Sequence, residues 1–193
     1  AVVTNPGAKG KGTLVVLNDE IHYARNVMKT NTTTVQTFVS INRGPAGVVN
    51  TGKIQWFEPM DRKVGPATGF SVDALDKLPR VDVIYAHANM SADLIDAAIK
   101  NGAKGLVIAG VGDGNMTTPA LDAVTRAAKS GIVVVRSTRL ASGITLRNNE
   151  VNDDEKGLVA SGELNPAKSR VLLQLALTKT NDPVQIQKMF YEY

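Results

Sequence analysis

The chain of 193 residues contains no cysteine, which excludes disulfides, thiolate nucleophiles and cysteine-bound zinc. Aromatic residues are scarce, at 5%. The 22 basic and 18 acidic residues are scattered singly, so no basic stripe is interleaved with aromatic side chains that would stack on bases. Long apolar runs are also missing: a run such as 132–135 is far shorter than the roughly 20 residues that span a bilayer. We therefore expect neither nucleic-acid binding nor a membrane span.

The first residues, Ala1-Val2-Val3-Thr4, lack the basic region, apolar run and small-residue cleavage site of a secretory signal peptide. A hydrophobic content of 43% over 193 residues is nevertheless sufficient for a sizeable core. We expect the chain to begin in the middle of a larger protein.

The first block, residues 1–57, contains short strand patterns and almost no amphipathic helix. Strands are expected at 13–17, 48–49 and 54–57. The last two are joined by turn residues at 50–53, whereas 18–34 is expected to be a polar segment. A bare sheet face costs roughly 25 cal/mol per Å² of apolar surface, so these strands need partners from another segment or chain. Residues 58–79 hold three prolines and two glycines without periodicity, which predicts an interdomain linker.

From residue 80 on, strand and helix patterns alternate. Strands are expected at 81–86, 106–109, 132–135 and 157–160. The unbroken β-branched run 132–135 indicates burial on both faces, as in parallel sheets. The alternation predicts an α/β fold, in which a small parallel-sheet C-terminal domain follows the strand-rich end of a larger α/β N-terminal domain.

Capping residues and apolar stripes predict four helices in this second part. Ser91 is expected to cap the first, Pro119 to occupy the first position of the second, and Asn165-Pro166 and Asp182-Pro183 to begin the last two. In the third helix, the inward side chains are expected to be Val171, Leu172, Leu175 and Ala176.

Glycines alternate with other residues directly after the expected strand 106–109, in the sequence Gly110-Val111-Gly112-Asp113-Gly114-Asn115. In open parallel sheets, ligands bind beyond the carboxyl ends of the strands, where alternating glycines expose backbone N–H groups. The spacing matches neither the dinucleotide fingerprint nor a phosphate loop. A ligand-binding loop and a tight strand-to-helix turn therefore both remain open. Glu150 follows the strand 132–135, where a carboxylate would face a ligand at the same edge.

Other titratable residues carry little signal by themselves. His22 and His87 stand far apart and lack a partner at metal-ligand spacing, which favours structural roles and predicts no metal site. Lys29 follows a strand end and would ordinarily be a surface lysine. A lysine amine accepts a proton in catalysis only where burial or nearby charge lowers its pKa from about 10.4 towards neutrality.

Four stretches of sequence, in order, resemble bacterial type II L-asparaginases and glutaminase-asparaginases over essentially the whole chain. They are VVLND at 15–19 followed by KTNTT at 29–33, AGVGDGN at 109–115, VVRSTR at 134–139, and LNPAKSRVLL at 164–173. The resemblance implies hydrolysis of L-asparagine, and often of L-glutamine, to the acid and ammonia by an amidohydrolase with a threonine nucleophile.

The resemblance also implies roles for three residues of this chain. The family's catalytic lysine falls on Lys29. An asparagine matching Asn115 and a carboxylate matching Glu150 come from a neighbouring subunit and lie near the substrate's α-amino group. The family's nucleophile lies in a Thr-Gly-Gly-Thr run, and its second threonine and aspartate in a His-Gly-Thr-Asp-Thr run. Neither run occurs here, so we expect a missing N-terminal half to supply the nucleophile.

Further expectations follow from the same resemblance. They are a homotetramer with active sites shared between subunits, no cofactor, and a periplasmic or secreted location. The domains would be 1–57 as the end of the N-terminal catalytic domain, 58–79 as the linker and 80–193 as the C-terminal α/β domain. The chain departs from the family at Met28, where threonine is usual, at Val64, where histidine is common, and at Asp113, where asparagine is usual. A thioether lacks a hydroxyl's hydrogen bond, and Asp113 adds negative charge near the pocket.

Two questions stay open at this stage. The segment LRN at 146–148 resembles the glutaminase-asparaginase branch, whereas GN at 114–115 resembles the asparaginase branch, so the preferred substrate is undecided. An alternative from another class is a non-catalytic fragment that acts as a ligand-binding or oligomerisation module. A binder of small anions or nucleotides built on residues 110–114 is a weaker third hypothesis.

Overall fold

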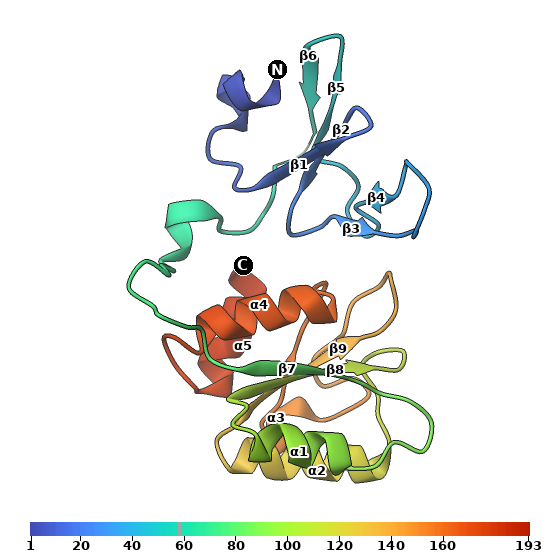
Figure 1. Cartoon of the computed structure of the whole chain (residues 1–193), viewed down its shortest axis with the longest axis vertical. Coiled ribbons are helices and arrows are strands. Elements are labelled where there is room, and N and C mark those ends of the chain that lie inside the picture. Colours follow the sequence, from blue (N-terminus) through green and yellow to red (C-terminus); the bar gives the residue numbers. More distant parts are fainter. Residues whose placement is uncertain (58) are drawn as a thin grey trace. The chain divides into compact units, whose positions relative to one another are not determined.

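The computed structural model describes residues 1–57 and 59–193. These residues form two compact units, Ala1–Phe70 together with Tyr193, and Ser71–Glu192 (Figure 1). The boundary between the units falls inside the expected linker segment, but the assignment of domains and linker stays a prediction. Among the described residues, none of the helices combines the length and the apolar character needed to cross a membrane.

The N-terminal unit is built on a four-stranded antiparallel sheet with the order β1-β2-β5-β6. Its strands are β1 (Leu14–Leu17), β2 (Glu20–Tyr23), β5 (Gly47–Asn50) and β6 (Lys53–Trp56). A separate two-stranded ribbon pairs β3 (Met28–Lys29) with β4 (Phe38–Val39). Short 3₁₀ turns lie at Val2–Thr4, Pro6–Ala8 and Gly65–Thr68.

The prediction of a polar segment over 18–34 is wrong for Glu20–Tyr23, which form the strand β2. Asn18 and Asp19 both have positive φ, 51° and 62°, as in a two-residue hairpin turn of type I′. The chain therefore reverses at once, and β2 pairs with β1 along its whole length. This buries Ile21, whose exposed fraction is 0%, in a small core, whereas Val16 on β1 remains 44% exposed.

The C-terminal unit contains a four-stranded sheet in the order β10-β9-β8-β7, and every pair in it is parallel. Its strands are β7 (Val81–Tyr85), β8 (Gly105–Gly110), β9 (Val133–Thr138) and β10 (Val159–Ala160). The helices are α1 (Asp93–Lys100), α2 (Thr118–Lys129), α3 (Asp153–Lys156), α4 (Pro166–Ala176) and α5 (Pro183–Glu192). Figure 1 shows α1, α2 and α3 on one face of the sheet and α4 and α5 on the other. The predicted α/β class with a parallel sheet is confirmed.

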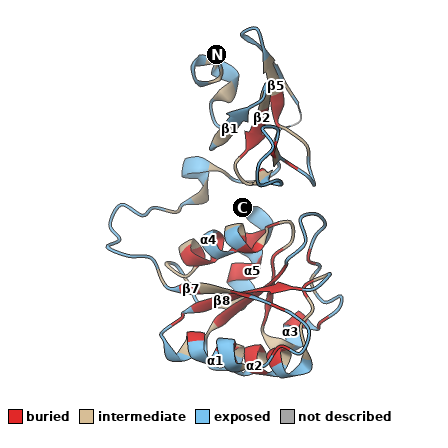
Figure 2. Cartoon of the chain, turned by 45° about the vertical axis from the view of Figure 1, so that its right-hand side comes forward, coloured by how far each residue is buried: buried red, intermediate tan, exposed pale blue. Residues whose placement is uncertain are grey.

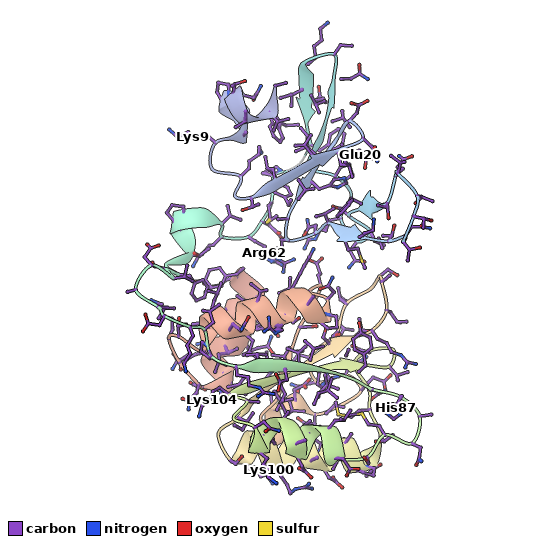
Figure 3. All side chains as sticks on the ribbon, in the orientation of Figure 1. Lys9, Glu20, Arg62, His87, Lys100 and Lys104 are labelled. Atoms are coloured by element: carbon purple, nitrogen blue, oxygen red, sulfur yellow. The ribbon has the colours of Figure 1, made fainter. Side chains whose placement is uncertain are left out.

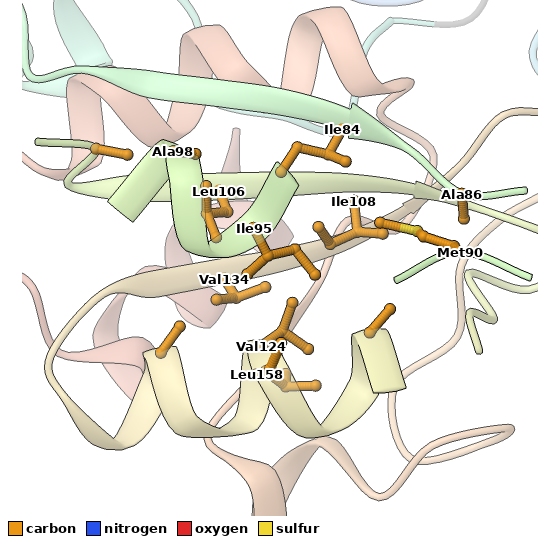
Figure 4. Close-up of a cluster of buried hydrophobic side chains, with 14 of the residues drawn as sticks. Ile84, Ala86, Met90, Ile95, Ala98, Leu106, Ile108, Val124, Val134 and Leu158 are labelled. Carbon is orange, nitrogen blue, oxygen red and sulfur yellow. The ribbon is translucent and has the colours of Figure 1, made fainter. Parts of the chain in front are cut away.

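The core of this unit lies between the sheet and helices α1 and α2. Ile95 of α1 and Val124 of α2 pack against Leu106 and Val134 of the central strands (Figure 4). Of the predicted buried run 132–135, Val133–Val135 are buried, whereas Ile132 lies before β9 and is half-buried. Strand β8 beside it is buried along its whole length (Figure 2). A rigid, fully buried pair of central strands therefore fixes where the loops at their carboxyl ends begin.

Three local predictions in this unit are wrong. Helix α1 begins at Asp93 with Ala92 as its N-cap, because the Ala92 carbonyl oxygen accepts from Asp96 N–H. Ser91 lies one residue earlier, and its Oγ atom accepts from Asp93 N–H. Helix α2 begins one residue before Pro119, because the hydroxyl oxygen of Thr117 caps it by accepting from Ala120 N–H.

The third error concerns the buried stripe of α4. Val171 is 52% exposed, whereas Leu173 has an exposed fraction of 0%. The helix packs on β7, β8 and β9, which centres its buried stripe on Leu172, Leu173 and Ala176. Successive helical residues are about 100° apart, so Val171 lies beyond the edge of that stripe.

Candidate functional site

Asn115 and Glu150 meet at the carboxyl edge of the parallel sheet. Strands β8 and β9 pair in register up to Gly110 and Thr138, so the loops that follow them start side by side. Asn115 lies in the loop between β8 and α2, and Glu150 in the loop between β9 and α3. The Asn115 Nδ2 atom donates a hydrogen bond of 2.8 Å to Glu150 Oε2. The structure thus brings together two of the three residues singled out from the sequence.

The glycine-rich loop that carries Asn115 is a closed turn. Val111 and Asn115 exchange two backbone hydrogen bonds, each 2.8 Å long. A Cβ atom on Gly110 would lie only 2.4 Å from the carbonyl carbon of Gly114, and Gly114 itself has a φ of 79°. Glycine is required at both places, by close approach at the first and by left-handed backbone at the second. The turn therefore presents Asn115 in a fixed position.

Asp113 ties this turn to the loop that carries Glu150. Its Oδ1 atom accepts from Leu146 N–H at 2.7 Å, and its Oδ2 atom accepts from Asn149 Nδ2 at 2.7 Å. Both carboxylate oxygens of the unusual aspartate are thus engaged by donors of the neighbouring loop. The carboxylate of Asp113, which adds a negative charge here, therefore links the two loops by accepting both hydrogen bonds.

Two residues shortly before Glu150 are held by a second carboxylate, that of Asp154. Asn148 Nδ2 donates to Asp154 Oδ2 at 2.6 Å, and Arg147 Nη2 forms an ion pair with Asp154 Oδ1. These hydrogen bonds, that of Asn148 first and that of Arg147 second, lower the pKa of Asp154 below its usual value. Arg147 Nη1 also donates to Gln187 Oε1 of α5 at 2.7 Å, which fastens the loop to the C-terminal helix.

Lys29 belongs to the N-terminal unit and is not among the residues brought together at this edge. It is an exposed residue of β3 and pairs with Phe38 of β4. Its Nζ atom lies 5.5 Å from the centre of the Phe38 ring, within cation–π distance. Met28, beside it, is half-buried opposite Val39.

The two histidines have different surroundings. His22 is buried on β2, with its Nδ1 atom 3.0 Å from Ser40 Oγ and its Nε2 atom 3.3 Å from Glu20 Oε2. His87 is exposed on the loop between β7 and α1 (Figure 3), with its Nδ1 atom 2.8 Å from the Ala88 carbonyl oxygen. Across residues 1–57 and 59–193, no group of three or more histidine and acidic side chains is placed to hold a metal ion.

Sequence reasoning missed the buried polar end of β9. The apolar run suggested a strand ending at residue 135, but β9 continues to Thr138, and Arg136 and Ser137 both have an exposed fraction of 0%. A signal was present, because Arg136 follows a fully apolar strand without any intervening turn residue. Charged residues are almost never fully buried unless they are paired, so a partner for Arg136 was missing from the prediction.

Together these features define an α/β protein that presents an amide–carboxylate pair on loops at the carboxyl edge of a parallel sheet. Residues 80–190 match the family described as Glutaminase/Asparaginase C-terminal domain, and residues 1–62 match the family described as Asparaginase, N-terminal. The chain belongs to the glutaminase/asparaginase family.

Three curated relatives illustrate the similarity. The chain is 47% identical over 195 residues to L-asparaginase 2 of Escherichia coli, covering 100% of this chain and 56% of that protein. It is 45% identical to the probable L-asparaginase periplasmic of Haemophilus influenzae, covering 100% and 55%. It is 37% identical to the glutaminase-asparaginase of Pseudomonas fluorescens, covering 100% and 53%. The chain thus spans about half the length of the curated relatives it matches.

Proposed function

We propose that this chain is part of an amidohydrolase that converts L-asparagine, and L-glutamine, to the corresponding acid and ammonia. The proposal is supported by membership of the family and by relatives named L-asparaginase and glutaminase-asparaginase. The observation that carries it is the 2.8 Å contact between Asn115 Nδ2 and Glu150 Oε2 at the carboxyl edge of the sheet.

The chemistry of this pair suits the α-ammonium group of an amino acid. An ammonium group has three N–H donors and no acceptor. The Asn115 amide gives a donor to Glu150, so its oxygen and the second carboxylate oxygen of Glu150 are acceptors for the ligand. A carboxylate fixed by a hydrogen bond is held in one orientation before the ligand arrives, which lowers the entropic cost of binding.

In this proposal Lys29 takes part in the bond-breaking step, together with a threonine hydroxyl from outside these 193 residues. The hydroxyl oxygen attacks the side-chain amide carbon of the substrate. The carbon–nitrogen bond then breaks, ammonia leaves with the proton that the hydroxyl has given up, and water hydrolyses the resulting ester to the acid and restores the hydroxyl. Asn115 and Glu150 bind and orient the substrate without exchanging protons with it.

The proposal extends to assembly and location. An active site completed by a second subunit, in a homotetramer, would bring the Asn115–Glu150 pair of one chain to the Lys29 of another. A periplasmic location is supported by the name of the Haemophilus influenzae relative.

The test is ammonia release by the full-length protein supplied with L-asparagine or L-glutamine. Glu150→Gln removes the anion that would face the ammonium group, and we expect kcat/KM to fall roughly tenfold to a hundredfold, mostly through KM. Glu155→Gln is a matched control, because Glu155 is an exposed glutamate of α3, the helix that follows the loop of Glu150. The proposal fails if the wild-type protein releases no ammonia from either amino acid.

A further inference from the structure

The loops that carry Asn115 and Glu150 share a support beneath them, a buried ion pair. Arg136 of β9 and Asp153, the first residue of α3, both have side chains with an exposed fraction of 0%. Arg136 Nε donates to Asp153 Oδ1 at 2.6 Å, and Arg136 Nη2 donates to Asp153 Oδ2 at 2.7 Å. This two-point geometry is the strong form of an arginine–carboxylate contact.

The remaining polar atoms of the pair hold the backbone of both loops. Arg136 Nη1 donates to the carbonyl oxygen of Asp113 at 2.8 Å, and Arg136 Nη2 donates to that of Leu146 at 3.0 Å. Asp153 Oδ2 accepts from Asn148 N–H at 2.9 Å. Asp113 lies two residues before Asn115, whereas Leu146 and Asn148 lie four and two residues before Glu150. The ion pair therefore links the backbones of the two loops through hydrogen bonds.

The contact with the glycine-rich turn is close as well as polar. A Cβ atom on Gly114 would lie 2.9 Å from Arg136 Nη1, so the backbone of that turn rests directly on the guanidinium group. The residue that follows is Asn115. A shift of the guanidinium group is thus transmitted to Asn115 through a single peptide unit.

Stability alone is a weak explanation for such a pair. Removing two charges from water carries a desolvation penalty, and replacing a buried ion pair by apolar residues of similar volume is often neutral or stabilising. Apolar side chains would not, however, provide donors for the carbonyl groups of Asp113 and Leu146 or an acceptor for the N–H of Asn148. What the ion pair adds is a fixed geometry for two loops that leave the sheet.

We propose that Arg136 and Asp153 are positioning residues that set the separation of Asn115 and Glu150, and with it the selectivity of the site for ligands that carry a primary ammonium group. This inference rests on the proposed function, because it gives that function a source of substrate selectivity. The pair does not touch the substrate in this arrangement, and it acts through the two loops.

The experiment compares two amide substrates in the full-length protein. L-Asparagine carries the α-ammonium group, and succinamic acid is the same amide without it. The double variant R136M/D153L removes both charges together, which avoids leaving one of them buried and unpaired. R80M/D82L is the matched control, because Arg80, which precedes β7, and Asp82 of β7 form an ion pair with 2.9 Å between Arg80 Nη2 and Asp82 Oδ2. Thermal unfolding of both variants monitors the fold.

For R136M/D153L, the ratio of kcat/KM for asparagine to that for succinamic acid is expected to fall roughly tenfold to a hundredfold, the range for lost hydrogen bonds to a charged group. The R80M/D82L variant is expected to keep the wild-type ratio. Addition of Glu150→Gln to R136M/D153L is expected to lower the ratio no further, because both changes remove the same interaction. A purely structural role would lower the rates on both substrates alike and leave the ratio unchanged, which would overturn the inference.

If R136M/D153L does not fold, Arg136→Lys decides the matter. A lysine keeps a positive charge against Asp153 but lacks the planar fork that reaches several acceptors at once. A drop in the ratio, smaller than tenfold, is expected, and a wild-type ratio would overturn the inference.

If the wild-type protein releases no ammonia, the proposed function fails and a structural readout replaces the kinetic one. In a crystal structure of R136M/D153L, or of Arg136→Lys if the double variant does not fold, the Asn115 Nδ2 and Glu150 Oε2 atoms are expected to lie beyond hydrogen-bond distance. Retention of the 2.8 Å contact seen in the wild-type chain would overturn the inference.

Discussion

The substitution Gly110→Ala tests whether the closed turn holds Asn115 in place. Gly110 is the last residue of β8, and the added Cβ atom would meet the carbonyl carbon of Gly114 at 2.4 Å and its Cα atom at 2.6 Å. Both are backbone atoms, so no side chain can rotate to relieve the contact. The turn between Gly110 and Asn115 must move as a whole.

The size of the movement follows from ordinary contact distances. Carbon atoms approach favourably to roughly 3.5 Å, so the turn must shift by about 1 Å. A shift of that size breaks the 2.8 Å hydrogen bond from Asn115 Nδ2 to Glu150 Oε2. We expect a loss of about 1–3 kcal/mol in the free energy of unfolding from overpacking. In addition, KM for asparagine should rise roughly tenfold or more.

Gly112→Ala is the matched control. Gly112 has a φ of 53°, and a Cβ atom there would meet nothing within 4 Å. An alanine at this φ costs about 1–2 kcal/mol in backbone strain without pushing on the turn. Urea unfolding should therefore show comparable losses of stability for the two variants, whereas KM for asparagine should rise only for Gly110→Ala. Equal KM values in the two variants would refute the idea that this close packing positions Asn115.

Three further predictions concern single side chains. Because hydrogen bonds from Asn148 and Arg147 lower the pKa of Asp154 from its usual 3.8 in the folded state, these contacts stabilise the fold at neutral pH, and their contribution is lost as the pH falls below that value. Asp154→Ala should therefore lose less stability than wild type between pH 7 and pH 3 in urea unfolding. Leu158→Ala should cost about 2–5 kcal/mol, since Leu158 has an exposed fraction of 0%, whereas Leu140→Ala, at a residue 54% exposed, should cost under about 0.5 kcal/mol; similar losses by calorimetry would contradict this view of the core. Asp113→Asn leaves one of two acceptors between the loops and should cost about 1 kcal/mol, which a urea titration would measure, and an unchanged midpoint would show that the two loops do not depend on this carboxylate.

The fold of the second unit was largely predictable because each signal acted over a short stretch of chain. The run of β-branched residues at 132–135 predicted a buried strand, and the structure has β9 from Val133. Proline after asparagine at 165–166 predicted the start of a helix, and α4 begins at Pro166 with Asn165 as its N-cap. The stripe of α4 was misplaced because burial there depends on how the helix lies across three strands. That orientation is a property of the packed unit and leaves no mark within eleven residues of sequence.

The N-terminal unit was harder to predict, because its shape depends on turns. A two-residue reversal at Asn18-Asp19 converts a polar-looking segment into the buried strand β2. The resemblance to a known family predicted that Asn115 and Glu150 both lie near the substrate's α-amino group, but it did not predict the hydrogen bond between them. The support from Arg136 and Asp153 was not foreseen, because the two residues are 17 positions apart and only the folded chain brings them together.

The strands β7, β8, β9 and β10 lie side by side in the order in which they are synthesised. Each new strand leaving the ribosome finds the edge of its predecessor already available, so the sheet can grow in one direction without waiting for distant segments. Helix α4, which covers β7, β8 and β9, is made only after all four strands. Until it emerges, one apolar face of the nascent sheet stays open to water, and a chaperone that recognises apolar strands would find its target there.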